Sequence, residues 1–338
     1  MNPPKFLFME TNRGCNLRCQ HCAFWTYDDD QSANYLTDAQ RESVIQEFAA
    51  MGGQTVVTCG GEPMLDRPRY FFLTDAARRA GLRCFSVVNG TKIRNAAEAD
   101  EMLEHGPSEV TVSVNSHVEA DHDVTRGVRG SWKMAIGALR LMLAARAKME
   151  LPAKIYAMAV IHEGNYRTLD AFFDFMLNDV GVDKLKLNIV QPSFGVASHD
   201  EFFSDGIVKD HAAFRAVVEA CNAKYGLGID PKWLDVVCGY FADVNRNGKA
   251  LMGWSAYENG KCGTKDVICN SCERNIMVNA FGRARLCFSP DFPSVRLRGG
   301  DLKVFWENAG WRDDMRKCTR YCGISHSVRA QPATARAA

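Results

Sequence analysis

The run Cys15-Asn16-Leu17-Arg18-Cys19-Gln20-His21-Cys22 carries three cysteines, with three residues between the first two and two residues between the last two. Cysteine thiolates are ligands of zinc and of iron–sulfur clusters. A [4Fe–4S] cluster takes four ligands, of which this run supplies three. The fourth iron is then open, and an open metal position is where a metal does chemistry. The spacing alone leaves a zinc knuckle, or reduced structural thiols, as the alternative.

The same run resembles the signature of the radical S-adenosylmethionine (radical SAM) superfamily, C-x3-C-x-φ-C, in which φ is aromatic and is here His21. The resemblance implies that Cys15, Cys19 and Cys22 hold a [4Fe–4S] cluster and that His21 belongs to the cofactor-binding residues. It also implies that S-adenosylmethionine (SAM) chelates the fourth iron through its amino and carboxylate groups. In this family, one-electron reduction splits SAM into methionine and a 5′-deoxyadenosyl radical.

Length and charge limit the class of protein. A chain of 338 residues can form one large domain and a smaller one. The formal net charge is +1 and no basic block stands out, so neither nucleic acid nor an anionic membrane is expected as the main partner. No apolar run approaches membrane-spanning length, and the first residues lack the long apolar segment of a signal peptide. We therefore predict a cytoplasmic protein.

The thirteen cysteines gather toward the two ends of the chain. In a chain without an export signal, such groups are typical of metal ligands rather than disulfides. Two separate metal sites are therefore expected. Four cysteines lie between the groups, and at least two of them are predicted to be small buried apolar residues: Cys59, Cys84, Cys221 and Cys238.

The first part of the chain, residues 1–195, alternates short β-like runs with amphipathic helical stretches. The predicted strands are 6–9, 55–59, 84–88, 110–114, 153–161 and 184–190, and the predicted helices are 37–50, 68–80, 96–104, 131–149 and 168–178. Such repeats predict an α/β fold with parallel strands and helices outside, as an open sheet or a barrel. The family resemblance implies a partial, TIM-like (βα)6 barrel. Functional residues are then expected at the carboxyl ends of the strands.

Cys59-Gly60-Gly61-Glu62-Pro63 directly follows the second predicted strand. Two glycines let the backbone approach a ligand closely, and a proline stiffens the exit from the loop. A Gly-Gly pair alone is an ordinary turn. Its position, however, resembles the family's GGE-type loop that holds the SAM amino group, which implies cofactor-binding roles for Gly60, Gly61, Glu62 and Pro63.

The fourth predicted strand leads into a second set of motif residues. Ser113 and Asn115 are followed by His122-Asp123, Arg126-Gly127 and Gly130-Ser131-Trp132. This order resembles the Ser-x-Asp…His-Asp…Arg-Gly…Gly-Ser-Phe run of radical SAM enzymes that carry extra clusters. Alternate strand residues share a face, so Ser113 and Asn115 are predicted to point together at SAM. Asn115 lacks the charge of the usual Asp. Arg126 is predicted to pair with the methionine carboxylate, the alternative being a solvated loop cation.

From Lys261 onward the chain is rich in cysteine. Cys272, nine residues, Gly282, four residues and Cys287 resemble the opening of the SPASM/twitch extension of radical SAM enzymes. Residues 275–287 predict a β-hairpin around Phe281-Gly282, which places two cysteines side by side. A helix is predicted from Leu302 to Trp311 and beyond.

Cys318 and Cys322 follow that helix and complete a set of four with Cys272 and Cys287. One auxiliary iron–sulfur cluster is favoured over two. Cys262 and Cys269 are surplus, and either can replace a ligand of this set. A zinc ribbon is the alternative. The predicted divisions are a connecting and substrate region at 196–260, with a helix over 210–225 and a turn at 245–248, an auxiliary-cluster domain at 261–326 and a disordered tail at 327–338.

The resemblance implies abstraction of hydrogen from an unactivated C–H bond, with the cofactor carrying that step and the protein positioning the substrate. Electron transfer to the auxiliary cluster would give an oxidation, and return of hydrogen by a thiol would give epimerisation; decarboxylation is also known among relatives. Cys238 is the candidate hydrogen donor, with a buried structural cysteine as the alternative. We expect a small polar metabolite, such as a sugar, aminocyclitol or nucleoside of an antibiotic pathway, and a flavodoxin or ferredoxin as electron donor.

Two other functions remain open. A peptide-modifying maturase often carries an N-terminal recognition domain, for which the early first strand leaves no room. A non-catalytic iron–sulfur electron carrier is disfavoured, because the first cysteine set has only three ligands and a SAM-type loop follows it.

Overall fold

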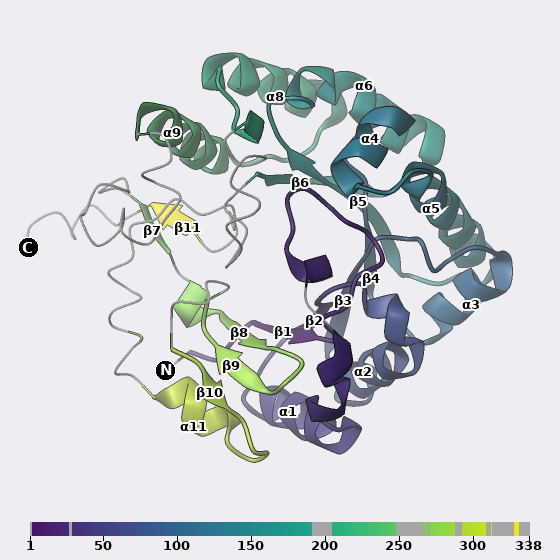
Figure 1. The fold of residues 1–338 in the computed structure, drawn as a ribbon. Coiled ribbons are helices and arrows are strands. Elements are labelled where there is room, and N and C mark those ends of the chain that lie inside the picture. Colours follow the sequence, from purple (N-terminus) through teal and green to yellow (C-terminus); the bar gives the residue numbers. More distant parts are fainter. Residues whose placement is uncertain are drawn as a thin grey trace, which may run out of the picture.

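The computed structural model describes residues 2–26, 29–190, 205–247, 267–269, 271–287, 293–308, 312 and 328–330. Six parallel strands form its centre, in the order of the sequence. They are β1 (Phe6–Glu10), β2 (Thr55–Cys59), β3 (Arg83–Val88), β4 (Glu109–Ser113), β5 (Lys154–Ile161) and β6 (Lys184–Ile189). Figure 1 shows them as an arc with helices on its outer side. In the described part of the chain the sheet does not close, which confirms the predicted α/β partial barrel.

Helices connect successive strands and pack on the outside of the arc (Figure 1). Those that follow β1 to β6 are α1 (Asp38–Ala50), α2 (Arg67–Arg79), α3 (Ala96–Glu104), α4 (Glu119–Arg126), α5 (Ser131–Lys148), α6 (Leu169–Asp174), α8 (His211–Tyr225) and α9 (Pro231–Asn247). The predicted helices agree with α1, α2, α3 and α5 within two residues at each end, and α6 continues as a π-helical turn over Phe175–Val180. None of the described helices is both long and apolar enough to cross a membrane.

Local sequence explains where α1 begins and ends. Thr37 accepts a hydrogen bond from the Gln40 amide, and the Gln40 side chain accepts one from the Thr37 amide, which is a capping box. Val44, Ile45 and Phe48 are fully buried and recur at helical spacing, so one face of the helix packs on the sheet. The helix ends where Gly52 adopts a φ of +81°.

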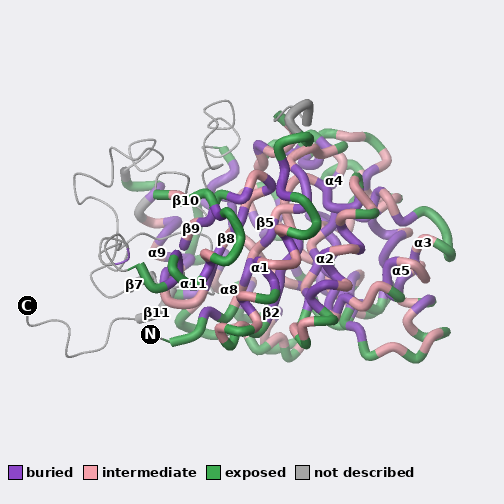
Figure 2. The backbone as a smooth tube through the Cα atoms, turned by 90° about the horizontal axis from the view of Figure 1, so that it is seen from below, coloured by how far each residue is buried: buried purple, intermediate pink, exposed green. Residues whose placement is uncertain are grey.

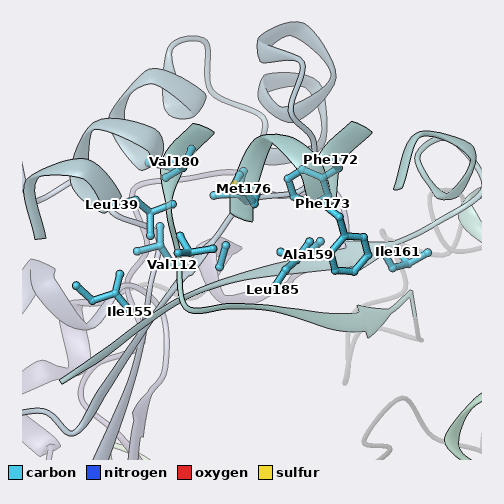
Figure 3. Close-up of a cluster of buried hydrophobic side chains, with 14 of the residues drawn as sticks. Val112, Leu139, Ile155, Ala159, Ile161, Phe172, Phe173, Met176, Val180 and Leu185 are labelled. Carbon is cyan, nitrogen blue, oxygen red and sulfur yellow. The ribbon is translucent and has the colours of Figure 1, made fainter. Parts of the chain in front are cut away.

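The main core lies between the sheet and the helices that follow β4 to β6. Figure 3 shows strand residues Val112, Ile155, Ala159, Ile161 and Leu185 packed against Leu139, Phe172, Phe173, Met176 and Val180 from the helical side. All ten side chains are buried. At about 25 cal/mol per Å² of apolar surface, such burial is the main force that holds the helices on the sheet. Along the backbone, buried segments run through the strands and exposed ones lie mostly at turns (Figure 2).

The predicted C-terminal hairpin forms and adds to the barrel sheet. Its strands are β8 (Asn275–Val278) and β9 (Arg283–Arg285), followed by β10 (Val295–Arg296). β8 pairs in parallel with β1, from Phe6 opposite Asn275 to Met9 opposite Val278. Buried residues of both segments share a second core cluster with α1, α2 and α11 (Leu302–Glu307). Local pattern predicts a hairpin, whereas its pairing with a strand about 270 residues earlier is a tertiary contact.

Three predictions of local structure are corrected. The predicted turn at 245–248 is wrong for Asn245 to Asn247, which lie in α9, because Val237, Phe241 and Val244 continue a buried helical face. α11 ends at Glu307, short of the predicted Trp311. Val328–Ala330 forms β11, antiparallel to β7 (Val267–Cys269), so the predicted disorder of 327–338 does not hold for these three residues.

Candidate active site

The cysteine loop starts at the carboxyl end of β1, as the barrel rule predicts. Cys19 is buried, and Cys15 and Cys22 are half-buried. Burial raises the pKa of the Cys15 thiol to about 12, and the neighbouring Cys19 and Cys22 add to this rise. Burial also raises the pKa of Cys22 to about 11, with a further contribution from Cys19. The three thiols therefore lie close enough to interact, in a place where thiolates need a compensating cation.

The loop after β2 clamps one side of the cysteine loop. The Gly61 amide donates to the Asn12 carbonyl at 3.1 Å, and the Glu62 amide donates to the Gly14 carbonyl at 2.8 Å. A Cβ at Gly61 would lie 1.8 Å from the Gly14 carbonyl oxygen, and one at Gly60 would lie 2.3 Å from the Asn12 oxygen. The two glycines were predicted to admit a ligand. The contact they make in the structure is with the cysteine loop itself.

Glu62 holds this turn together from inside. Its side chain is 1 % exposed, and its two carboxylate oxygens accept hydrogen bonds from the amides of Met64 (3.0 Å) and Asn89 (2.7 Å). Burial raises the pKa of Glu62 to about 7, although both hydrogen bonds oppose the rise. Pro63 is buried at the start of a 3-10 turn, Pro63–Asp66. The carboxylate of Glu62 thus connects the loops after β2 and β3.

A second clamp comes from the end of α4. The amides of Arg18 and Gln20 donate to the carbonyls of Arg126 and Thr125, both at 3.1 Å. Gly127 has a φ of +67°, and a Cβ there would lie 2.3 Å from the Arg18 carbonyl oxygen. Backbone contacts from two loops therefore fix the path of the chain between Cys15 and Cys22.

A third contact joins the cysteine loop to the loop after β3. The Asn16 amide group donates to Thr91 Oγ1 at 2.8 Å, and the Asn89 amide group donates to Asn16 Oδ1 at 3.0 Å. The cysteine loop is therefore tied to the segments that follow β2, β3 and β4, so its conformation is prearranged by the barrel.

Arg126 is the buried cation of the site. It is 6 % exposed, donates to the Ser113 carbonyl at 3.2 Å and has Nη1 3.4 Å from His21 Nε2. Its charge lowers the pKa of Cys22 against the larger effect of burial. Its Nε has no hydrogen-bond partner. The alternative of a solvated loop cation does not hold, because the guanidinium is buried beside His21 and Cys22.

Asn115 lies two residues beyond the end of β4 at Ser113, and the Val114 amide still donates to the Met158 carbonyl of β5 at 2.8 Å. The predicted contact of Asn115 with SAM stays a prediction. Asn115 is 2 % exposed; its side chain donates to Thr125 Oγ1 at 3.0 Å and accepts from the Val160 amide at 3.2 Å. The side-chain carbonyl and amino groups thus both bond within the protein. Ser113 is half-buried at the strand end, where its carbonyl accepts from Arg126.

The other motif residues after β4 are structural. Asp123 accepts hydrogen bonds from the Gly130 amide, the Ser131 hydroxyl and the Trp132 amide, and so fixes the start of α5. Burial alone would raise the pKa of Asp123, but these hydrogen bonds bring it below its usual value. His122 is 1 % exposed, and burial lowers its pKa to about 3. Its Nδ1 accepts the Asn115 amide at 3.1 Å.

The structure brings together only part of the predicted auxiliary set. Cys272 is buried and Cys287 is half-buried, and both contact the second core cluster at the open end of the hairpin. Cys269 lies on β7, and nothing further is described of its side chain. Cys262, Cys318 and Cys322 lie outside the described residues. The cysteines whose side chains are described form no disulfide with one another. The auxiliary cluster therefore stays a prediction.

The prediction that at least two of the four cysteines between the two groups are buried is confirmed. Cys84, Cys221 and Cys238 are buried, and Cys59 is half-buried at the end of β2. The Cys238 thiol lies 3.6 Å from the His211 carbonyl, between α9 and α8, and burial raises its pKa. This is the environment of a packing cysteine. A role as hydrogen donor stays a prediction.

The radical SAM superfamily pattern matches residues 9–176, which include the cysteine loop, both clamps and Arg126. The chain contains a radical SAM domain. The activity, reaction and substrate of the whole protein are matters for proposal. The domain implies a [4Fe–4S] cluster and SAM, and the residues fit both: three mutually close thiols, and beside them a buried guanidinium with an unpaired Nε.

Curated relatives match the chain over part of their length. An AdoMet-dependent heme synthase of Methanosarcina barkeri is 28% identical over 141 residues, 42% of this chain and 40% of that protein. An Fe-coproporphyrin III synthase of the same organism is 30% identical over 166 residues, which are 48% of this chain and 39% of that protein. A pre-heme d1 synthase of Dinoroseobacter shibae is 28% identical over 186 residues, which are 55% of this chain and 43% of that protein. The radical SAM chain thus matches about two fifths of the length of these relatives.

Solved structures share the fold over nearly the whole chain. SuiB of Streptococcus suis superposes with a TM-score of 0.65 at 14% identity, covering 94% of this chain and 68% of that one. AnSMEcpe with bound AdoMet gives a TM-score of 0.63 at 16% identity, covering 93% and 83%. At such identities the likeness shows the fold alone.

The zinc alternative gains no support from the radical SAM domain. Thiolates are also zinc ligands, so zinc in the cysteine loop stays an alternative that metal analysis of the purified protein would decide.

Proposed function

We propose that this protein holds a [4Fe–4S] cluster through Cys15, Cys19 and Cys22 and cleaves SAM reductively, in order to abstract hydrogen from a C–H bond of a small polar molecule. The observation that carries the proposal is the cysteine loop, clamped at the carboxyl edge of the barrel beside buried Arg126. When bound, the cluster and SAM supply a 5′-deoxyadenosyl radical, chemistry that no acid or base side chain offers.

The residues of the site would act by holding and orienting. Arg126 has one buried N–H left for an anionic group, which suits the methionine carboxylate of SAM. The backbone of Gly60 and Gly61 lies against the cysteine loop and borders the same space. Because thiols must lose their protons to bind iron, and burial raises the pKa of Cys15 and Cys22, cluster assembly should strengthen as pH rises.

Reductive cleavage of SAM tests the proposal directly. The anaerobically reconstituted protein, given SAM and dithionite, should release 5′-deoxyadenosine, and Cys15→Ala should abolish the release. Cys287→Ala serves as the matched control, because it removes a cysteine of the second group and should leave part of the release. A wild-type protein with a reduced cluster but no 5′-deoxyadenosine would instead support the electron carrier.

We further propose one auxiliary cluster, held by Cys272, Cys287, Cys318 and Cys322, with Cys262 or Cys269 as a substitute for one of them. The hairpin that carries Cys272 and Cys287 supports it. About eight irons per chain are then expected after reconstitution, falling by about four in Cys287→Ala. A wild-type value near four with an unchanged Cys287→Ala spectrum would remove the auxiliary cluster from the proposal.

A small-molecule substrate is favoured because curated relatives are named for reactions of small molecules. Examples are the synthesis of heme and, for the Tolumonas auensis protein, the 3′,8-cyclisation of GTP. Sugars, aminocyclitols and nucleosides remain the proposed class, with flavodoxin or ferredoxin as electron donor and a cytoplasmic location. Turnover of candidate substrates in deuterated water separates the outcomes: deuterium at one carbon without net oxidation means epimerisation, and an unlabelled, oxidised product means dehydrogenation or decarboxylation. Turnover of a peptide instead would establish the maturase.

A further inference from the structure

Arg285 is a cation on the inner side of the barrel sheet, and its Nε has no hydrogen-bond partner in the described part of the chain. It lies on β9, between Ala284 and Leu286, which are fully buried in the second core cluster. Successive strand residues point to opposite faces, so the Arg285 side chain points to the barrel side. It is half-buried, its Nε is completely covered, and no hydrogen bond to it is present among the residues that the structure describes.

The register places Arg285 beside the start of the cysteine loop. Arg285 is opposite Met277 on β8, and Met277 is opposite Phe8 on β1. Two strand spacings, roughly 10 Å, therefore separate the backbone of Arg285 from that of β1. Phe8 and Glu10 alternate with outward-facing Leu7 and Met9, so they face the same interior. Figure 1 shows β8 and β9 continuing the arc of strands beyond β1.

Glu10, a carboxylate within electrostatic range of Arg285, already has other partners. It accepts a hydrogen bond from the Ala280 amide at 3.2 Å and pairs with Arg13 at 3.9 Å. Arg285 acts on Glu10 only at longer range, without a direct ion pair. Arg41 is a further cation nearby, and backbone carbonyls of Leu36, Glu10 and Thr11 occupy its donors. Arg285 thus has no ion pair with a carboxylate among the residues that the structure describes.

A covered Nε–H group without a hydrogen-bond partner is costly unless a ligand completes it. Its planar fork of N–H donors matches the oxygens of a carboxylate or phosphate. We propose that Arg285 binds an anionic group, a carboxylate or a phosphate, of the substrate inside the barrel. The inference rests on the proposed function, since it names a chemical feature of that substrate. It makes the C-terminal hairpin part of the substrate-binding wall.

Anion titration of the reconstituted, full-length protein with SAM present tests the assignment. The probes are succinate and inorganic phosphate, with uncharged succinamide as a control, and binding is measured by calorimetry. At least one anion should bind wild type ten or more times more tightly than Arg285→Gln, and Arg285→Lys should retain part of the affinity because it keeps the charge. Whichever anion shows the difference identifies the group.

Arg283→Gln is the matched control. Arg283 lies on the same strand and, two residues away, on the same face as Arg285, but it is exposed and lies nearer the hairpin tip. The affinity of Arg283→Gln for the anion should stay within twofold of wild type. Because both variants are measured under the same conditions, the difference in affinity between them reports the contribution of Arg285, whether or not SAM is bound. Equal binding by wild type and Arg285→Gln, or an equal loss in Arg283→Gln, would overturn the inference. So would a lowered thermal midpoint in both Arg285→Lys and Arg285→Gln, which would make Arg285 structural. Release of 5′-deoxyadenosine by wild type tests the proposed function separately.

Discussion

At the scale of single residues, close contact with the backbone of the cysteine loop requires glycine at two positions of the site, Gly60 and Gly61. Gly61 is the tightest case, because a Cβ there would lie 1.8 Å from the Gly14 carbonyl oxygen. Backbone held by three sets of hydrogen bonds cannot move away as a flexible side chain can. Position 61 therefore admits only glycine, because any side chain there would overlap the cysteine loop.

Gly61→Ala should reduce the free energy of unfolding by roughly 3 kcal/mol and impair cluster assembly, because the Glu62–Gly14 hydrogen bond cannot form beside an added methyl group. Denaturant titration of the apoprotein and the iron content after reconstitution are the measurements. Gly137→Ala is the control: no atom lies within 4 Å of its added Cβ, and a helical alanine should stabilise α5 by about 0.5–1 kcal/mol. Normal iron content in Gly61→Ala would contradict the clamp.

His122 should make stability depend on pH. Its folded pKa of about 3 lies below the ordinary value of 6.5, so the unfolded chain binds more protons between these values. Stability is then fully present above pH 6.5 and falls with pH, by about 2 kcal/mol from this group between pH 7 and pH 5. His122→Asn keeps an acceptor for the Asn115 amide and should lose about 2 kcal/mol less over this interval, as measured by denaturant titration at each pH. His162, whose pKa is lowered to about 4, adds its own slope to both proteins and cancels in the comparison.

At the scale of elements, the hairpin tip joins the C-terminal extension to the cysteine loop. The Phe281 ring meets the Tyr35 ring edge-on at 5.1 Å between centroids, and the Arg13 guanidinium lies 5.7 Å above it. The Arg13 amide in turn donates to the Tyr35 hydroxyl at 3.1 Å. A side chain 266 residues after Cys15 (281 − 15) therefore supports the loop that carries this cysteine.

Phe281→Ala should lower the free energy of unfolding by about 2 kcal/mol, because it removes both ring contacts from a half-buried position. Chemical denaturation of the apoprotein checks the value. Val304→Ala on α11 is the control, since this side chain is 69 % exposed and the change should stay within about 0.5 kcal/mol. If both variants had the same stability, the hairpin tip would not support the cysteine loop.

At the scale of the whole molecule, the barrel and the hairpin share one sheet and one core cluster. Leu7 and Met9 of β1 pack with Ile276 and Val278 of β8 and with Trp306 of α11. Segments that share strand pairing and buried apolar surface lose both together, so they should unfold as one unit. This differs from a separate C-terminal domain joined by a linker, which would keep a core of its own.

Calorimetry of the apoprotein should therefore show a single transition, and the amides of β1 and β8 should have equal protection from hydrogen exchange. Phe281→Ala should shift this whole transition rather than split it. Two resolved transitions, with β8 exchanging well before β1, would show that the hairpin forms an independent unit.

The sequence alone determined the six strands of the barrel and most of its helices, because these depend on short-range periodicity. The cysteine loop was indicated by ligand spacing, and its class of chemistry by the resemblance to the radical SAM superfamily. The sequence also indicated the hairpin from Phe281-Gly282. It did not reveal α4, α9 or the capping role of Asp123, which depend on packing partners. Tertiary structure alone decided that Gly60 and Gly61 face the cysteine loop, that Asn115 is taken up inside the protein, and that Arg285 stands on the barrel wall. Each of these features depends on contacts between segments that are far apart in the sequence. A local sequence pattern does not indicate which distant segment will pack against it.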